Sequence, residues 1–197
     1  MLQVSQDIIL FRADNPSPMT LGGTNCFILS EPAALTNQRN ALLIDVGPDD
    51  LAHLSVMRDF LDRNHLRLQG ILLTHTHRDH IGGLASFLRM ARAPVSAFKD
   101  GYDHRLTDGQ RIALGDDQLR VIHTPGHAGD CVCFFHEREG ILFTGDTILG
   151  FGTSVIAPPA GDVSDYLDSL ERLQALPTKM IAPGHGPSSA AAVDWKL

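Results

Sequence analysis

The sequence predicts an α/β or α+β sandwich, because strand-like and helix-like segments mix along the whole chain. Short apolar runs bounded by glycine and proline recur in both halves of the 197 residues, and apolar side chains at helical spacing lie between them. Neither a fixed-period repeat nor a low-complexity linker divides the chain. We therefore expect a single domain over residues 1–197.

The first half of the chain predicts strands and helices in alternation. Apolar runs indicate strands at residues 4–12, 24–30, 41–46, 70–74 and 95–98. Helical spacing indicates a helix over 51–61, with Asp49 or Asp50 near its start, and a second helix over 84–88 that ends before Pro94. Prolines and glycines between residues 14 and 23 indicate a long turn.

The second half begins with four short strands within residues 110–143, separated by turns that contain Gly115, Gly126 and Gly140. The clearest amphipathic helix follows over residues 163–173, and a last strand is expected at 179–182. Because apolar strands occur in both halves, each half is expected to contribute to a sheet.

Composition limits the kinds of partner. Lys and Arg number 16 against 23 Asp and Glu, which gives a formal net charge of −7 and argues against a surface that coats nucleic acid. Three cysteines cannot form a disulfide framework, and an odd number fits a reducing compartment. The amino terminus has no signal-peptide pattern, and no apolar run approaches the roughly 20 residues that cross a bilayer. We expect a cytoplasmic protein without membrane contact.

The strongest local signal is Thr74-His75-Thr76-His77-Arg78-Asp79-His80, directly after a predicted strand. Three imidazoles and a carboxylate lie within a few residues, and both are metal-ligand types. At a strand end, residues i and i+2 point the same way, so His75 and His77 can hold one ion. Asp79 and His80 would face a second position beside it. The alternative for Asp79 is a helix N-cap.

Three later segments also place a His or Asp at the end of an apolar run. They end at His127, Asp146 and His185, and a glycine precedes each of these residues. A residue without a side chain lets the backbone approach a crowded centre closely. Each His or Asp alone would be an ordinary turn residue, but four such sites at strand ends indicate one shared centre.

The combined pattern resembles the metal-binding motif of the metallo-β-lactamase superfamily, in the order of that family from residue 75 to residue 185. The resemblance implies a four-layer αββα sandwich with a dinuclear metal site at one edge, between the sheets. The residues implied for the first metal are His75, His77 and His127, those for the second are Asp79, His80 and His185, and Asp146 bridges the two.

A dinuclear metal site of this kind is typical of hydrolases. Two cations about 3.5–4 Å apart lower the pKa of a bridging water and polarise a substrate oxygen. We expect a metal-bridging hydroxide to be the nucleophile, with Asp79 and Asp146 as the catalytic carboxylates. Imidazole and carboxylate ligands suit zinc and also accept iron or manganese. We expect two Zn²⁺ per chain, with Fe or Mn as alternatives.

The resemblance also indicates a particular branch of the superfamily. True β-lactamases of this superfamily have Cys or Ser where Asp146 stands, so hydrolysis of β-lactam drugs is not expected. Residues 15–25, 144–155 and 162–173 resemble the β-lactamase-like protein 2 branch. That branch includes a mitochondrial single-strand endoribonuclease and is similar to fungal polyketide-releasing thioesterases.

Departures from these relatives favour a small acyl substrate. Only twelve residues follow His185, whereas members of the branch often carry a helical extension that helps to bind RNA. Cys131 stands where glyoxalase II has a second His. We expect an ester or thioester hydrolase, with a single-strand endoribonuclease or a non-hydrolytic iron-binding redox scaffold as alternatives. The oligomeric state is left open.

Several residues near the motif fit more than one role. The loop over residues 148–159 can form a substrate rim or fold back into the core, and Pro16, Pro18 and Met19 would form the opposite rim. Asp45 closes an apolar strand and can orient a ligand or the loop of His75 to His80. We expect His53, His65, His104 and His136 on polar surfaces or loop edges, and His123 as an ordinary strand residue, with a position beside His127 as the alternative.

Overall fold

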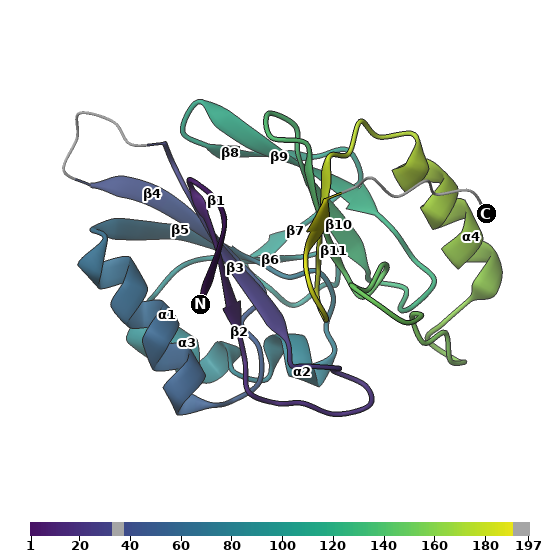
Figure 1. Cartoon of the computed structure of the whole chain (residues 1–197), viewed down its shortest axis with the longest axis horizontal. Helices are drawn as coiled ribbons and strands as arrows, with labels where there is room; N and C mark the ends of the chain where they lie inside the picture. Colours follow the sequence, from purple (N-terminus) through teal and green to yellow (C-terminus); the bar gives the residue numbers. More distant parts are fainter. Residues whose placement is uncertain (33–37, 191–197) are drawn as a thin grey trace.

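Two β-sheets lie face to face in the centre of the molecule, with helices outside each of them (Figure 1). The structure is a computed structural model that describes residues 1–32 and 38–190. Within these residues the chain forms one seven-stranded and one six-stranded sheet. The predicted four-layer αββα sandwich is therefore confirmed.

The first sheet is built from the amino-terminal half of the chain, with its strands in sequence order. They are β1 (Leu2–Ser5), β2 (Ile8–Arg12), β3 (Asn25–Ser30), β4 (Arg39–Ile44), β5 (Leu66–Leu72), β6 (Val95–Ala97) and β7 (His104–Arg105). Strands β1 to β4 pair antiparallel, whereas β4 to β7 pair parallel. The parallel strands end at the same edge, where the residues that follow β5 can meet those that follow β4.

The second sheet is built from the carboxy-terminal half. Its strands are, in spatial order, β13 (Ser189–Ala190), β12 (Met180–Pro183), β11 (Ile141–Gly145), β10 (Val132–His136), β9 (Asp117–His123) and β8 (Arg111–Leu114). Only the pair β11 and β12 is parallel among these described strands. Both of these strands therefore deliver their carboxyl ends, and the residues that follow them, to one edge.

The three longer helices of the described chain cover the outer faces, and the shortest one lies at one end of the sheets. The helices are α1 (Leu51–Arg63), α2 (Arg78–Ile81), α3 (Leu84–Met90) and α4 (Val163–Gln174). Helices α1 and α3 lie on the first sheet and α4 lies beside the second, as Figure 1 shows. Asp50 caps α1 and Asp162 caps α4, each by accepting a backbone N–H of the first turn. None of the helices in the described ranges is long and apolar enough to cross a membrane.

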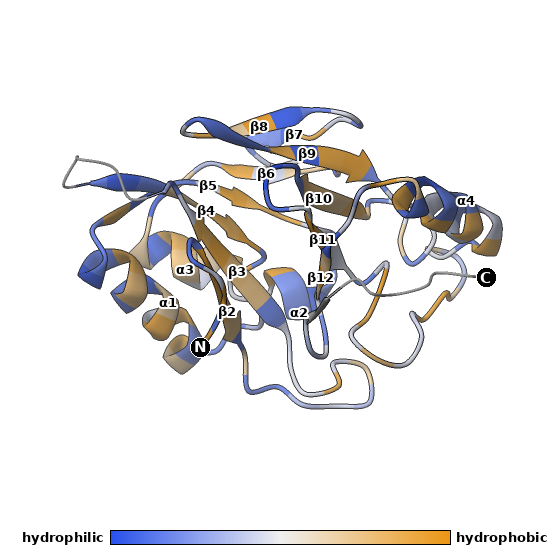
Figure 2. Cartoon of the chain, turned by 45° about the horizontal axis from the view of Figure 1, so that its top comes forward, coloured by the Kyte–Doolittle hydropathy of each residue, from blue (hydrophilic) through white to orange (hydrophobic). Residues whose placement is uncertain are grey.

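The hydrophobic core has three parts, one at each contact between neighbouring layers of the four-layer sandwich. The central part joins the two sheets, where the rings of Phe27 and Phe143 meet edge to face with centroids 5.1 Å apart. The second part joins the first sheet to α1 and α3, and the third joins the second sheet to Leu173 of α4. Figure 2 shows the hydrophobic strands enclosed between the helical layers. This alternation of apolar faces fixes the register of the strands.

The structure corrects the sequence prediction in three places. Residues 4–12 form two strands rather than one, because the polar pair Gln6 and Asp7 makes a turn between β1 and β2. The two-residue strand β7 is missing from the sequence prediction, because it contains no apolar run. His53 and His136 are buried rather than exposed, and the Nε2 atom of His136 lies 2.8 Å from the Oδ2 atom of Asp117.

Candidate metal centre

Four segments bring the predicted ligands together at one edge of the sandwich. His75 and His77 follow β5, and Asp79 and His80 belong to the short helix α2 that comes next. The other three, His127, Asp146 and His185, lie at the ends of β9, β11 and β12 or just beyond them. The amino-terminal sheet thus supplies four of the predicted ligands, and the carboxy-terminal sheet supplies the remainder.

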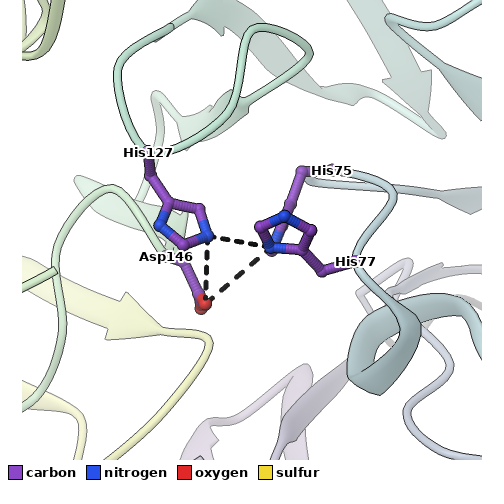
Figure 3. Close-up of side chains that lie close together, drawn as sticks. All are labelled: His75, His77, His127 and Asp146. Atoms are coloured by element: carbon purple, nitrogen blue, oxygen red, sulfur yellow. Dashed lines mark hydrogen bonds and ion pairs between the residues drawn. The ribbon is translucent and has the colours of Figure 1, made fainter. Parts of the chain in front are cut away.

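The first cluster contains His75, His77, His127 and Asp146, which point toward one another (Figure 3). The Nδ1 atom of His77 lies 3.0 Å from the Nε2 atom of His75 and 2.9 Å from the Nε2 atom of His127. The Oδ2 atom of Asp146 lies 3.9 Å from His75 Nε2 and 3.6 Å from His127 Nε2. Three nitrogens and one oxygen therefore surround one point.

The second cluster contains Asp79, His80, His185 and again Asp146. Here the Oδ1 atom of Asp146 lies 3.2 Å from His80 Nε2 and 3.4 Å from His185 Nε2. His185 Nε2 is also 3.1 Å from the Oδ2 atom of Asp79. Because Asp146 presents one oxygen to each cluster, it lies between them.

The outer nitrogens of the ligand rings are held by hydrogen bonds. His127 Nδ1 lies 2.6 Å from the carbonyl oxygen of Val155, and His185 Nδ1 lies 3.2 Å from that of Gly23. A carbonyl oxygen only accepts, so both outer nitrogens carry the hydrogen and donate it. In the neutral ring the inner nitrogen then keeps its lone pair, which is the form that binds a metal.

Asp45 supports both clusters. Its Oδ2 atom accepts from Nδ1 of His80 at 2.8 Å and from the hydroxyl of Thr74 at 2.7 Å, and its Oδ1 atom accepts the backbone N–H of Thr74 at 2.8 Å. The Thr74 oxygen in turn lies 3.1 Å from Nδ1 of His75 and is its acceptor. The prediction that Asp45 orients a ligand and the motif loop is consistent with these contacts.

Burial and neighbouring charges shift the pKa values of two ligands of the first cluster, His75 and Asp146. Burial, and next the neighbouring His80, lower the pKa of His75 well below its usual value. Burial would raise the pKa of Asp146, but the charge of His80 and the adjacent ring of His185 outweigh it and hold that pKa well below its usual value. Asp146 is therefore ionised and His75 is neutral. Both are the forms that bind a cation.

The second cluster holds protons more tightly. Burial alone would lower the pKa of His185, but the carboxylates of Asp146 and Asp79 beside its ring raise it to about 9. The carboxylates of Asp146 and Asp45 likewise raise the pKa of His80 well above its usual value, against the effect of burial. Since a histidine ligand must be neutral, a cation would replace the protons that these rings carry between the carboxylates.

The residues present fit a pair of divalent cations. The Oδ1 atom of Asp146 is buried and makes no hydrogen bond within the described chain, although two ring nitrogens lie beside it. Ring nitrogens of the first cluster face one another at 2.9 and 3.0 Å, where two lone pairs repel unless a proton or a cation lies between them. A donor set of imidazoles and carboxylates suits zinc, iron and manganese.

The glycines before the ligands make this crowding possible. A Cβ atom at Gly184 would lie 2.7 Å from Asp146 Oδ1 and 2.8 Å from a carbon of the His80 ring. A Cβ at Gly145, where φ is +49°, would lie 2.7 Å from the Thr74 side chain. Only glycine leaves room at these two positions, which confirms the reason that the sequence suggested.

A cavity of about 710 Å³ opens directly over the clusters. His77, Asp79, His127 and Asp146 form its polar side. Apolar parts of the wall come from Met19 and Pro48, and from Val155, Ala157 and Ala160. The rim over residues 148–159 therefore contributes, and the alternative in which that loop folds back into the core is wrong. Of the opposite rim, Met19 lines the cavity whereas Pro16 and Pro18 do not. Arg78 is the only Lys or Arg among the described residues that line the cavity.

The structure also resolves the smaller alternatives. His77, not Asp79, stands at the N-cap position of α2, and the Asp79 carboxylate faces His185 instead. His123 lies apart from His127: its ring stacks on Phe98 with centroids 3.8 Å apart. Sequence reasoning assigned no role to Thr74 or to the carbonyl groups of Gly23 and Val155. Thr74 stands next to the motif, but every residue has a carbonyl group, so no signal could have singled out those two.

Comparison with known proteins agrees with this arrangement. The family model described as "Metallo-beta-lactamase superfamily" matches residues 19–102 and 92–185. A metallo-beta-lactamase family protein from Thermus thermophilus has the same fold, with a TM-score of 0.78 and 22% identity over 95% of this chain and 76% of the other. The two matched segments contain every predicted ligand.

Two curated relatives are more similar in sequence. The beta-lactamase-like protein 2 homolog of Caenorhabditis elegans is 32% identical over 196 residues, which cover 94% of this chain and 63% of the nematode protein. The atrochrysone carboxyl ACP thioesterase of Aspergillus fumigatus is 33% identical over 189 residues, which cover 93% of this chain and 57% of the thioesterase. The chain thus spans less than two thirds of the length of either relative. With the family model, the fold and the ligand pattern in agreement, the chain belongs to the metallo-beta-lactamase superfamily.

Proposed function

We propose that the chain is a dinuclear metal-dependent hydrolase that acts on an ester or thioester with an apolar acyl group. The observation that carries this proposal is the position of Asp146. Its two oxygens face two separate clusters of ligand atoms, and the residue itself lines the cavity. When bound, two divalent cations would supply an activated water and polarise the substrate carbonyl.

The chain's own residues would have distinct tasks in this reaction. His75, His77 and His127 would hold one cation, and His80, His185 and Asp79 would hold the other. Asp146 would serve both cations, because its two oxygens face the two clusters. Asp79 also lines the cavity, and in this proposal its carboxylate takes a proton from the reacting water and passes it to the leaving group.

The wall of the cavity supports an acyl substrate. Met19, Val155 and Ala157 give the acyl chain an apolar surface beside the reacting centre. A phosphodiester substrate such as RNA would favour several Lys or Arg side chains around the site, and Arg78 is the single one among the described lining residues. Similarity to a fungal thioesterase supports the same choice.

The test is a comparison of substrates on metal-loaded protein. Chelated protein is reloaded with Zn²⁺, Mn²⁺ or Fe²⁺ and assayed on acyl thioesters of increasing chain length, on lactones and on single-stranded RNA. We expect thioester hydrolysis that depends on added metal. Asp146→Asn should lower it by about 100-fold or more, as expected when an electrostatic contribution to the transition state is lost. Asp59→Asn, an exposed change on α1, is the matched control.

Other outcomes would overturn the proposal. Cleavage of RNA without hydrolysis of any thioester, ester or lactone would favour a single-strand endoribonuclease instead, and binding would then weaken steeply with salt. Metal analysis tests the third alternative. Iron that changes oxidation state during turnover, without hydrolysis, would indicate a redox scaffold, whereas two equivalents of zinc with hydrolytic activity would exclude it.

We also propose a reducing, cytoplasmic location. All three cysteines, Cys26, Cys131 and Cys133, are free and buried, and burial raises the pKa of Cys133 to about 11. Unpaired thiols of this kind are typical of reducing compartments. Fractionation of cells that make the protein tests this, and recovery from an oxidising compartment would contradict it.

A further inference from the structure

One residue of the cavity wall touches both the substrate space and a ligand. The side chain of Val155 lines the cavity, and its carbonyl oxygen accepts the hydrogen of His127 Nδ1 at 2.6 Å. That hydrogen bond fixes the orientation of the His127 ring in the first cluster. The position of the wall and the position of a ligand are therefore set by the same backbone group.

The segment that carries Val155 has little else to hold it. Residues 151–156 belong to no helix or strand. Apart from the Val155 carbonyl, their only hydrogen-bonding group with a partner among the described residues is the hydroxyl of Ser154. Its Oγ lies 2.6 Å from the carbonyl oxygen of Asp146 and 3.1 Å from that of Thr147. Ser154 thus joins the wall directly to the backbone of the bridging ligand.

We propose that Ser154 is a positioning residue for the first cluster. By donating to the Asp146 carbonyl it holds the adjacent Val155 carbonyl where His127 can donate to it. The wall over residues 151–156 then aligns His127, a ligand of the first cluster alone, through the carbonyl of Val155. The substrate consequence rests on the proposed function: an acyl group that packs on Val155 contacts the same segment that orients the first cation.

The variants isolate the hydroxyl of Ser154. Ser154→Ala removes it, and Ser154→Thr restores a hydroxyl at the same position. Thr153→Ala is the matched control, because Thr153 is exposed and makes no hydrogen bond in the described chain. Thermal unfolding of the metal-free variants shows that each is folded before its metal affinity is compared.

The first measurement uses the metal alone. Co²⁺ is titrated into chelated protein in competition with a chromophoric chelator, and the absorption of bound Co²⁺ reports the geometry of its ligands. Two backgrounds separate the clusters: His185→Asn disables the second cluster, and His77→Asn disables the first. We expect Ser154→Ala to weaken the remaining site about 10-fold in the first background, the size seen for lost support of a ligand. In the second background it should change affinity less than twofold.

Ser154→Thr should restore both the affinity and the Co²⁺ spectrum. Equal affinities for Ser154→Ala and Thr153→Ala in the His185→Asn background would overturn the proposal, and so would equal weakening in both backgrounds. Since the titration needs no substrate, it stays interpretable if no thioester is hydrolysed. If thioesters are hydrolysed, Ser154→Ala should also raise the KM for long acyl chains more than for short ones.

Discussion

Asp45 shows how much one buried side chain can control at the residue scale. Its carboxylate is 1% exposed and reaches a ligand in each cluster, His80 directly and His75 through the hydroxyl of Thr74. It also stands at φ +55°, a left-handed conformation that is uncommon outside glycine. A residue in this place must tolerate that backbone and accept three hydrogen bonds.

Asp45→Asn tests the second requirement alone. Asn adopts the left-handed conformation readily and has nearly the same shape, so the backbone should be kept. Its amide nitrogen cannot accept from His80 and Thr74 as the carboxylate oxygen does. We expect metal affinity to fall by about 10–100-fold, measured by chelator competition. Asp59→Asn on the surface of α1 should leave it unchanged, and an unaltered affinity in Asp45→Asn would show that the support is dispensable.

Helix α4 illustrates the next scale, because it packs on the second sheet and also touches two ligand loops. The hydroxyl of Tyr166 donates to the carbonyl of Thr147 at 2.9 Å, next to Asp146. The hydroxyl of Ser169 donates to the carbonyl of Pro125 at 2.7 Å, two residues before His127. The packing of α4 therefore bears on the positions of both loops.

Two leucines of α4 provide a matched comparison. Leu173 is 3% exposed and packs against the second sheet, whereas Leu167 is 47% exposed. Leu173→Ala should lower the free energy of unfolding by about 2–5 kcal/mol, because it removes apolar contacts and leaves a cavity. Leu167→Ala should change it by less than about 0.5 kcal/mol. Denaturant unfolding of the two variants measures the difference, and equal values would contradict the packing described for α4.

An ion pair ties α4 to the loop before β8 and gives a pH-dependent prediction. The guanidinium of Arg172 contacts both carboxylate oxygens of Asp108, at 2.9 and 2.8 Å. Burial would raise the pKa of Asp108, but the backbone N–H of His123 and the Arg172 guanidinium outweigh it and lower that pKa. A lowered pKa adds stability above the unfolded value of about 3.9, and this is lost as the pH falls through the folded pKa.

Asp108→Asn should therefore differ from the natural chain at neutral pH and converge with it in acid. About half of each side chain is exposed, so solvent screens the pair and the difference should stay within about 1 kcal/mol. Denaturant unfolding at pH 7 and at pH 3 measures it. If the difference in free energy of unfolding between the two proteins became larger toward pH 3, it would contradict this prediction.

At the scale of the whole molecule, each cluster draws ligands from both sheets. His75 and His77 follow a strand of the first sheet, and His127 and Asp146 follow strands of the second. Asn25 of the first sheet also donates through its side chain to the carbonyls of Pro183 and Gly186, on either side of His185. A bound cation would cross-link the two halves as well as complete the site.

Metal should accordingly stabilise the fold. A ligand that binds only the folded state at about 100 times its Kd adds about 2.7 kcal/mol, which corresponds to roughly 5–10 °C in Tm for a chain of this size. Differential scanning calorimetry with and without Zn²⁺ measures the shift. His77→Ala with His185→Ala removes a ligand from each cluster and should abolish most of it. An unchanged Tm in the natural chain would contradict a folded-state metal site.

Local patterns along the chain predicted an α/β sandwich and one centre shared by residues at strand ends, whereas the four layers and the assignment of ligands to two metals came from the family resemblance. Apolar runs and helical spacing depend on neighbouring residues alone, and seven His and Asp residues at strand ends are visible in the order of residues. The single domain over residues 1–197 and the binding of metal stay predictions. Where local patterns were weak, at the turn of Gln6 and Asp7 and at β7, the prediction of the fold was wrong or incomplete.

The groups that hold the ligands in place became visible only in the folded chain. Folding paired His127 with the carbonyl of Val155 and His185 with that of Gly23, and it brought Asp45 to a ligand in each cluster. His185 and Gly23 are 162 positions apart in the chain. Such contacts depend on how two sheets meet in space, and a carbonyl group is common to every residue. No pattern in the sequence could mark the few that matter.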